Sequence, residues 1–92
     1  MDLLTEDEIS ARLPGLPGWE RTGGSIAATF SRADFRDSLL FLGMVAYLAE
    51  AAGHHPDVAI SWNKVTLTLS THSAGGLTGA DFALAEKISG LA

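Results

Sequence analysis

The chain has 92 residues, with six Lys or Arg, eleven Asp or Glu, three His and no Cys, and 47% of its residues are hydrophobic. This length is typical of one small domain, which we expect to span residues 1–92. A net charge of −5 argues against nucleic-acid binding, because phosphate backbones are bound by basic surfaces.

The sequence also argues against a disulfide-rich, a secreted and a membrane-spanning protein. Without cysteine there is no disulfide framework and no thiolate chemistry, which favours a reducing compartment such as the cytoplasm. The stretch MDLLTEDEIS has neither the basic nor the apolar part of a signal peptide. The longest uncharged apolar run, 39–49, is shorter than the roughly twenty residues of a membrane span, so we expect no membrane partner.

The first part of the chain predicts a short helix and a hairpin. Thr5 and Glu8 have the spacing of a capping box, and the prolines and glycines of LPGLPGW end the helix that follows. Apolar residues alternate along 25–31, which indicates a strand, and 19–22 is its expected partner across a Gly23-Gly24 turn.

A long helix is predicted next, beginning at Ser31 or Asp34 and ending near Ala52 with Gly53 in the left-handed conformation. Its apolar stripe comprises Phe35, Leu39, Leu42, Ala46 and Ala49. The other faces are also mostly apolar, so we expect one side to pack on the sheet and another to meet a second copy of the chain.

The segments 58–62 and 65–71 predict a second hairpin with Asn63-Lys64 as its turn. This register joins three apolar pairs, Trp62 with Val65, Ile60 with Leu67, and Val58 with Leu69. Continued further, it places His55 opposite His72. We therefore expect the third histidine to return to the first two.

Thr78 and Asp81 predict the cap of a last helix, which carries Phe82, Ala85 and Ile88 on its apolar side. The element order is α-β-β-α-β-β-α. Hairpin-paired strands with helices on one face predict an α+β fold with a four-stranded antiparallel sheet.

The three histidines favour acid–base chemistry. His54 and His55 are neighbours on an extended chain and point to opposite sides, which argues against a shared metal ion. No GxSxG or HExxH pattern accompanies them. Imidazole exchanges protons near neutral pH, and Glu50, one helical turn before His54, is expected to orient it. A polar turn after a helix is the alternative explanation of His-His-Pro.

One stretch resembles a known signature. It reads Glu50, three residues, His54-His55-Pro56, five residues, Trp62, nine residues, His72, eight residues, Asp81. This is similar to the motif of the pterin-4a-carbinolamine dehydratases. The likeness extends through LPGW, FSRADFRDSLLFLGMVAYLAE and GGLTGADFALAEKI, and so covers nearly the whole chain.

The resemblance implies a fold, a reaction and partners. The fold is a four-stranded antiparallel sheet with three helices on one face, assembled as a homodimer or homotetramer. The reaction is dehydration of a 4a-hydroxytetrahydropterin to the quinonoid dihydropterin in tetrahydrobiopterin recycling. The pterin is the substrate, and neither a metal nor an organic cofactor is implied. An aromatic amino-acid hydroxylase would act in the same pathway.

The resemblance also implies roles for individual residues. His54 and His72 would serve as acid and base, and His55 would hold the pterin or share the proton transfer. Glu50 would orient His54. The other substrate-binding candidates are Trp19, Ser70, Thr71 and Asp81.

Several of these roles have alternatives. Trp19 matches an aromatic residue that lines the family's pocket, and a core tryptophan beside a turn fits it equally. Asp81 stands at the third position of a helix, where capping is a sufficient role. The backbone of residues 70–72 is expected to bind the edge of the pterin ring.

Two positions depart from the family's pattern. Gly53 stands where some members carry an acidic residue, and Ser73 stands where many have Asp or Glu. These departures bear on substrate affinity and on which pterin side chain is accepted. A non-catalytic role of the same fold, in protein binding, as a dimerisation cofactor or in assembly, is the competing hypothesis.

Overall fold

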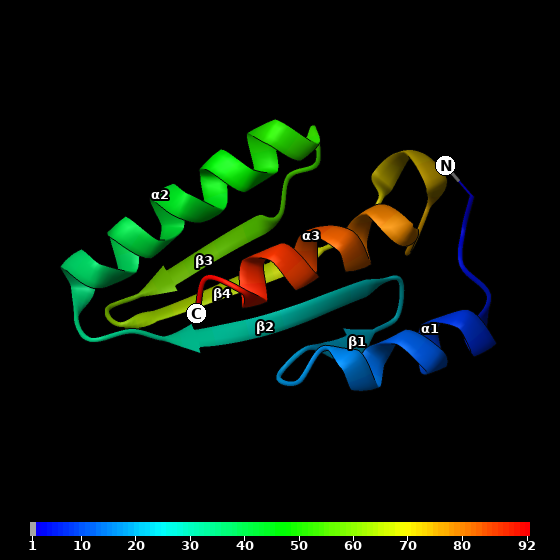
Figure 1. Cartoon of the computed structure of the whole chain (residues 1–92), viewed down its shortest axis with the longest axis horizontal. Coiled ribbons are helices and arrows are strands. Elements are labelled where there is room, and N and C mark those ends of the chain that lie inside the picture. Colours follow the sequence, from blue (N-terminus) through cyan, green and yellow to red (C-terminus); the bar gives the residue numbers. More distant parts are fainter. Residues whose placement is uncertain (1) are drawn as a thin grey trace.

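The computed structural model describes residues 2–92, so Met1, the first residue of the expected domain, lies outside the described residues. Figure 1 shows the elements in chain order. Their bounds are α1 Glu6–Arg12, η1 Leu13–Gly15, β1 Glu20–Thr22, β2 Ser25–Ser31, α2 Phe35–Ala52, β3 Asp57–Ser61, β4 Lys64–Leu69, η2 His72–Ala74 and α3 Gly79–Ser89. Apart from the two short 3-10 helices, this is the predicted order.

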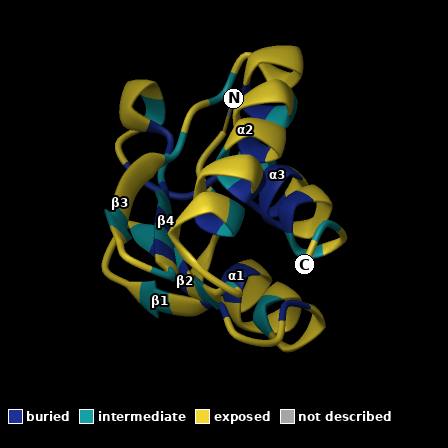
Figure 2. Cartoon of the chain, turned by 90° about the vertical axis from the view of Figure 1, so that its left-hand side faces the viewer, coloured by how far each residue is buried: buried dark blue, intermediate teal, exposed yellow. Residues whose placement is uncertain are grey.

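The four strands form one antiparallel sheet in the order β1-β2-β4-β3. Figure 2 shows α1, α2 and α3 on the same side of the sheet, with the buried residues between the two layers. The predicted α+β architecture is thereby confirmed. The edge strands are β1 and β3, and no helix of the described part is long and apolar enough to cross a bilayer.

The predicted helix caps are present. Thr5 with Glu8 and Thr78 with Asp81 both form complete capping boxes. Asp34, not Ser31, caps α2 by accepting a hydrogen bond from the backbone N–H of Asp37. Gly53 ends α2 with φ of 62°, a conformation that glycine adopts without a steric penalty.

The buried side of α2 differs from the apolar stripe read from the sequence. Phe35 and Leu39 are 50% and 46% exposed. The residues of α2 that are buried are Ser38, Phe41, Val45 and Ala49. The Ser38 hydroxyl donates to the carbonyl of Asp34, which satisfies its polar group inside the core. Because α2 is apolar on several sides, its sequence does not determine which side faces the sheet. The polar Ser38 also made the side that is buried look less apolar than the others.

The predicted register of the second hairpin is wrong by two residues. Val58 pairs with Leu67 and Ile60 with Val65, so Trp62 and Asn63 form the turn. A shift of two keeps every side chain on its predicted face but changes its partner. Because β3 begins only at Asp57, opposite Thr68, the ladder does not bring His55 and His72 together.

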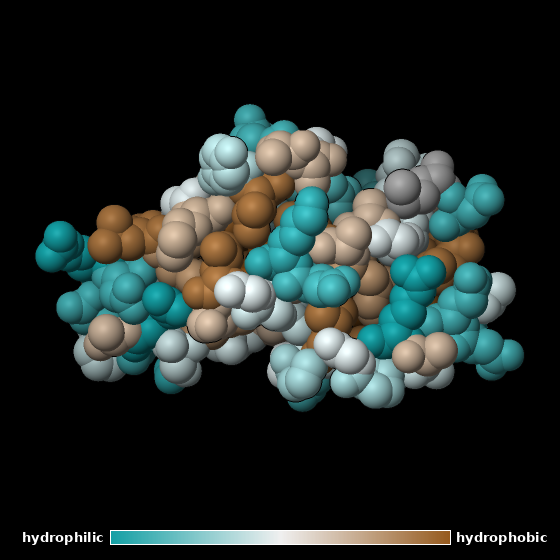
Figure 3. Space-filling model, viewed as in Figure 1, coloured by the Kyte–Doolittle hydropathy of each residue, from teal (hydrophilic) through white to brown (hydrophobic). Residues whose placement is uncertain are grey.

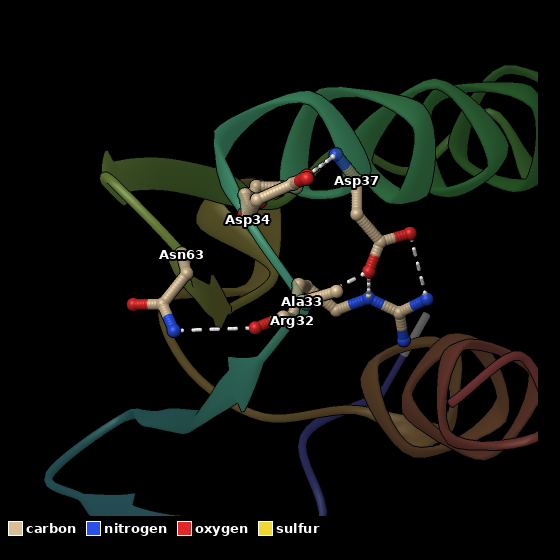
Figure 4. A network of polar contacts seen from close by, with 6 residues as sticks. Arg32, Ala33, Asp34, Asp37 and Asn63 are labelled. Atoms are coloured by element: carbon tan, nitrogen blue, oxygen red, sulfur yellow. Dashed lines mark hydrogen bonds and ion pairs between the residues drawn. The ribbon is translucent and has the colours of Figure 1, made fainter.

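Asn63 explains why the turn lies where it does. Its side-chain amide donates to the carbonyl of Arg32, and its own carbonyl accepts the Arg32 backbone N–H at 2.7 Å. Figure 4 shows these residues beside Asp37, whose carboxylate accepts hydrogen bonds from the Ala33 backbone and the Arg32 guanidinium. The turn is therefore fixed by the β2–α2 connection, which sequence periodicity does not report.

Candidate functional site

His54 is held by a buried carboxylate. It follows the glycine that ends α2, and its Nε2 lies 2.5 Å from Oδ1 of Asp81. Asp81 is completely buried, whereas the His54 side chain is 16% exposed. The prediction that Glu50 orients His54 is wrong, because the carboxylate that contacts the His54 ring belongs to Asp81 in α3.

Asp81 is the centre of a buried hydrogen-bond network. Its second oxygen, Oδ2, accepts a hydrogen bond from the Thr71 hydroxyl at 2.8 Å and from the Thr78 backbone N–H at 2.9 Å. The hydroxyls of Thr71 and Thr78 are also hydrogen-bonded to each other, at 2.8 Å. The cap of α3 and the contact to His54 are thus made by one carboxylate. A substrate-binding role through direct contact, expected for Asp81, does not agree with its full burial.

Glu50 contacts His55 instead. The Glu50 carboxylate is hydrogen-bonded to Nε2 of His55, and both side chains are exposed. They lie at an open groove of about 380 Å³ lined by Leu42, Val45, Ala46, Ala49, Glu50, His55, Pro56 and Val58. Adjacent residues of an extended chain point to opposite sides, so His54 faces α3 while His55 faces the flank of α2.

His72 begins η2 and is exposed. It directly follows Thr71, so the segment that carries His72 is tied to His54 through Asp81. The hydroxyl of Ser70 donates to the carbonyl of Gly24.

Thr71 is unsuited to bind the pterin ring through its backbone. Its N–H donates to Gly76, and its carbonyl accepts hydrogen bonds from the backbone N–H groups of Ala74 and Gly75. Its hydroxyl belongs to the Asp81 network. The expected contact of the Thr71 backbone with substrate is therefore not supported, since these groups already have partners within the fold.

Trp19 is a core residue. Its ring packs edge-on against Phe30 with centroids 6.0 Å apart, and its Nε1 donates to the Ser89 hydroxyl at 2.8 Å. Ser89 is the last residue of α3, whereas Asp81 is near the beginning. With a rise of about 1.5 Å per residue, these two positions are about 12 Å apart along the helix. Of the two interpretations of Trp19, the structure favours the core.

Sequence reasoning gave Thr78 only a capping role, and it missed both the hydroxyl contact of Thr78 with Thr71 and the contact between Asp81 and His54. A capping residue is normally close to solvent, so the capping box gave no indication that its carboxylate reaches a histidine. A signal was available in the apolar residues that follow Asp81, which are typical of a buried helix start. Within residues 2–92, no three His, Asp or Glu side chains are gathered as in a metal site.

Comparison with known proteins agrees with this fold. The profile of the family described as "Pterin 4 alpha carbinolamine dehydratase" matches residues 2–91. A relative from Roseiflexus castenholzii, whose name provisionally assigns it as a pterin-4-alpha-carbinolamine dehydratase, is 57% identical over 86 residues. The match covers 94% of this chain and 92% of that protein.

Two solved structures resemble the chain. The crystal structure of a protein from Brucella melitensis, described as a transcriptional coactivator/pterin dehydratase, is 34% identical with a TM-score of 0.95, over 99% of each chain. A pterin dehydratase-like protein identified as a RuBisCO assembly factor is 23% identical with a TM-score of 0.65, over 79% of this chain and 84% of its own. At that identity the likeness shows the fold alone. The family profile and the first relative each cover more than nine-tenths of the chain, and the chain therefore belongs to the pterin 4 alpha carbinolamine dehydratase family.

Proposed function

We propose that the chain, as a single domain over residues 1–92, catalyses the dehydration of a 4a-hydroxytetrahydropterin to the quinonoid dihydropterin. The C4a–O bond breaks, the hydroxyl leaves as water after protonation, and N5 loses its proton as the C4a=N5 bond forms. One group must give a proton and a second must take one. Two histidines with different surroundings suit this pair of transfers.

The observation that carries the proposal is the contact of His54 with Asp81. A buried carboxylate bonded to Nε2 fixes the imidazole ring and leaves Nδ1 as the nitrogen available for proton transfer. We assign His54 as the base and the exposed His72, on the adjoining segment, as the acid. General acid–base help of this kind is worth about 10²- to 10⁴-fold in rate.

His55 and Glu50 have a different role in this proposal. They lie at the groove beside α2, where the imidazole could hold the edge of a bound pterin or pass a proton to solvent. Their exposure makes them suited to substrate capture rather than to the central transfer. Gly53 and Ser73, which depart from the family's pattern, are both exposed. We infer that they influence which pterin side chain the site accepts.

The experiment that tests the proposal is stopped-flow absorbance of the decay of 4a-hydroxytetrahydropterin. The intermediate is generated in situ by an aromatic amino-acid hydroxylase, which is also the partner enzyme that we infer for the pathway. Wild type is compared with the His54→Ala, His72→Ala double variant, and with Thr29→Val on the exposed face of the central strand β2 as a control. Acceleration that requires the two histidines supports the proposal. Decay at the uncatalysed rate with wild type contradicts it.

A second function, protein binding without chemistry, is favoured by one observation. Helix α2 exposes a row of large apolar side chains, namely Phe35, Leu39, Leu40, Met44 and Tyr47, and Val58 and Trp62 are exposed on and next to β3. Figure 3 shows hydrophobic residues over the region where α2 lies in Figure 1. Exposure of several large apolar side chains on one helix is typical of an interface.

We infer that a second copy of the chain covers this surface, giving a homodimer or homotetramer that works in the cytoplasm. Self-association needs no partner beyond the chain itself, and the absence of cysteine suits a reducing compartment. The relatives described as a coactivator and as an assembly factor make a non-catalytic partner the alternative. Retention of Glu50, the three histidines and Asp81 favours the enzyme.

A further inference from the structure

We propose that Thr71 is a positioning residue for His54. Its hydroxyl, fixed by Thr78, holds the Asp81 carboxylate in the orientation that binds Nε2 of His54, so that Nδ1 is the nitrogen that exchanges the proton. The effect of Thr71 on turnover rests on the proposed dehydration, whereas its effect on which ring nitrogen of His54 is protonated does not. The role differs from substrate contact, because Thr71 acts entirely through Asp81.

The direction of each hydrogen bond in the network follows from its members. The Thr78 backbone N–H is an obligatory donor, and Thr71 Oγ1 donates its single hydrogen to the same Asp81 oxygen, Oδ2. The contact between the two hydroxyls must then be donated by Thr78. Thr78 Oγ1 in turn accepts the Ala80 backbone N–H at 3.3 Å. The chain of donors therefore ends at Asp81.

This direction determines what His54 can do. With two donors on Oδ2, the oxygen that faces His54 is Oδ1, at 2.5 Å from Nε2. An ionised carboxylate only accepts, so Nε2 of neutral His54 is the donor in this contact with Asp81. Neutral His54 is then protonated on Nε2 and has its lone pair on Nδ1, to which no hydrogen bond is made within residues 2–92.

Loss of the Thr71 hydroxyl would disturb this arrangement. Asp81 is fully buried, so bulk solvent does not reach Oδ2 to replace the lost donor. The carboxylate would rotate toward its remaining donors, and the constraint on the imidazole ring would weaken. Because Thr71 precedes His72, the same change loosens the support of the segment that carries the second histidine.

Thr71→Val tests the proposal, since valine keeps the shape of threonine and removes only the hydroxyl. Thr71→Ser is the conservative variant that keeps the donor. Thr29→Val is the matched control, because Thr29 also shares a hydroxyl pair, with Thr66 at 2.9 Å, but on an exposed part of the sheet. The ¹⁵N shifts of the His54 ring, assigned in full-length protein with labelled histidine, report which nitrogen is protonated.

We expect wild type, Thr71→Ser and Thr29→Val to show His54 protonated on Nε2, and Thr71→Val to show a mixture of the two tautomers. We also expect kcat to fall at least about ten-fold in Thr71→Val with KM within about two-fold, and to be restored in Thr71→Ser. An unchanged tautomer in folded Thr71→Val overturns the proposal, and so does failure of serine to restore it.

The ring measurement also separates this inference from the proposed function. If wild type has no dehydratase activity but Thr71→Val shifts the tautomer, the positioning role stands and the dehydration fails. If Thr71→Val does not fold, Thr71→Ala replaces it, because alanine also removes the hydroxyl that donates to Asp81. A fully Nε2-protonated His54 in that folded variant would overturn the proposal.

Discussion

The carboxylate of Asp81 contacts His54 through one oxygen and completes the cap of its own helix through the other. The two residues are separated by 27 positions in sequence, and Asp81 is fully buried. The start of α3 and the ring orientation of His54 therefore depend on the same side chain. A change at His54 should affect both activity and stability.

The two histidines assigned to proton transfer should differ in their effect on folding. We expect His54→Ala and His72→Ala each to lower turnover by about 10²-fold or more. Only His54→Ala should also lower the free energy of unfolding, by about 1–3 kcal/mol, because it leaves Oδ1 of buried Asp81 without a partner. Urea unfolding and stopped-flow kinetics on both variants measure this. Equal stabilities would show that the contact with Asp81 contributes little to the fold.

Asp81→Asn should be more damaging than its small change in size implies. The amide has one oxygen, whereas Asp81 accepts hydrogen bonds on both. Either the NH₂ group faces two donors at the Oδ2 position, or it faces Nε2 of His54 and reverses the ring's tautomer. We expect kcat to fall by at least about ten-fold and the free energy of unfolding to fall by about 1–3 kcal/mol. Retention of full kcat in a folded protein would argue against His54 as the base.

The element order and the helix caps could be predicted because they depend on local sequence. Thr5, Asp34 and Thr78 each satisfy backbone N–H groups of the next turn, and Gly53 supplies the left-handed residue that ends α2. These interactions span a few residues, so spacing alone reveals them.

The site could be predicted only in part, because its contacts are not local. Sequence indicated His54 and His72, but the partner of His54 comes from α3 rather than from Glu50 in the preceding turn. The hairpin register depends on hydrogen bonds between Asn63 and Arg32. Alternation of apolar residues has a period of two and cannot distinguish registers that differ by two.

The exposed face of α2 should control the oligomeric state. Leu40 and Met44 are one turn apart on this face and are 58% and 43% exposed. We expect Leu40→Glu with Met44→Glu to shift a wild-type oligomer to monomer without unfolding it, since both side chains lie outside the core. Sedimentation equilibrium measures the mass. The control is Ala11→Glu on exposed α1, which should leave the mass unchanged. A monomeric wild type would contradict the proposed interface.

The connection between β2 and α2 should lose stability in acid. The Ala33 backbone N–H and the Arg32 guanidinium both donate to Asp37 and lower the pKa of its carboxyl group. A folded pKa below the unfolded value gives stability that is present above about pH 4 and lost as pH falls through the folded pKa. We expect Asp37→Asn to be less stable than wild type at pH 7, with the difference disappearing toward pH 2.

Urea unfolding at several pH values tests this expectation. The matched control is Asp57→Asn on the edge strand β3, whose carboxylate makes no hydrogen bond or ion pair in the described residues. The stability difference between Asp57→Asn and wild type should change less between pH 7 and pH 2. A pH-independent effect of Asp37→Asn would mean that the loop is held by Asp34 and Asn63 alone.

Trp19 should matter for folding and little for catalysis. Trp19→Phe removes the indole N–H, leaves the Ser89 hydroxyl without its donor and reduces the volume of the buried ring. We expect the free energy of unfolding to fall by about 1–3 kcal/mol. The kinetic constants kcat and KM should remain within about two-fold of wild type, because the contact lies at the end of α3 away from Asp81. Ser89→Ala is the control for the hydrogen bond alone, and it should cost part of the same stability. A large rise in KM in Trp19→Phe with unchanged stability would instead make this tryptophan part of the pterin pocket.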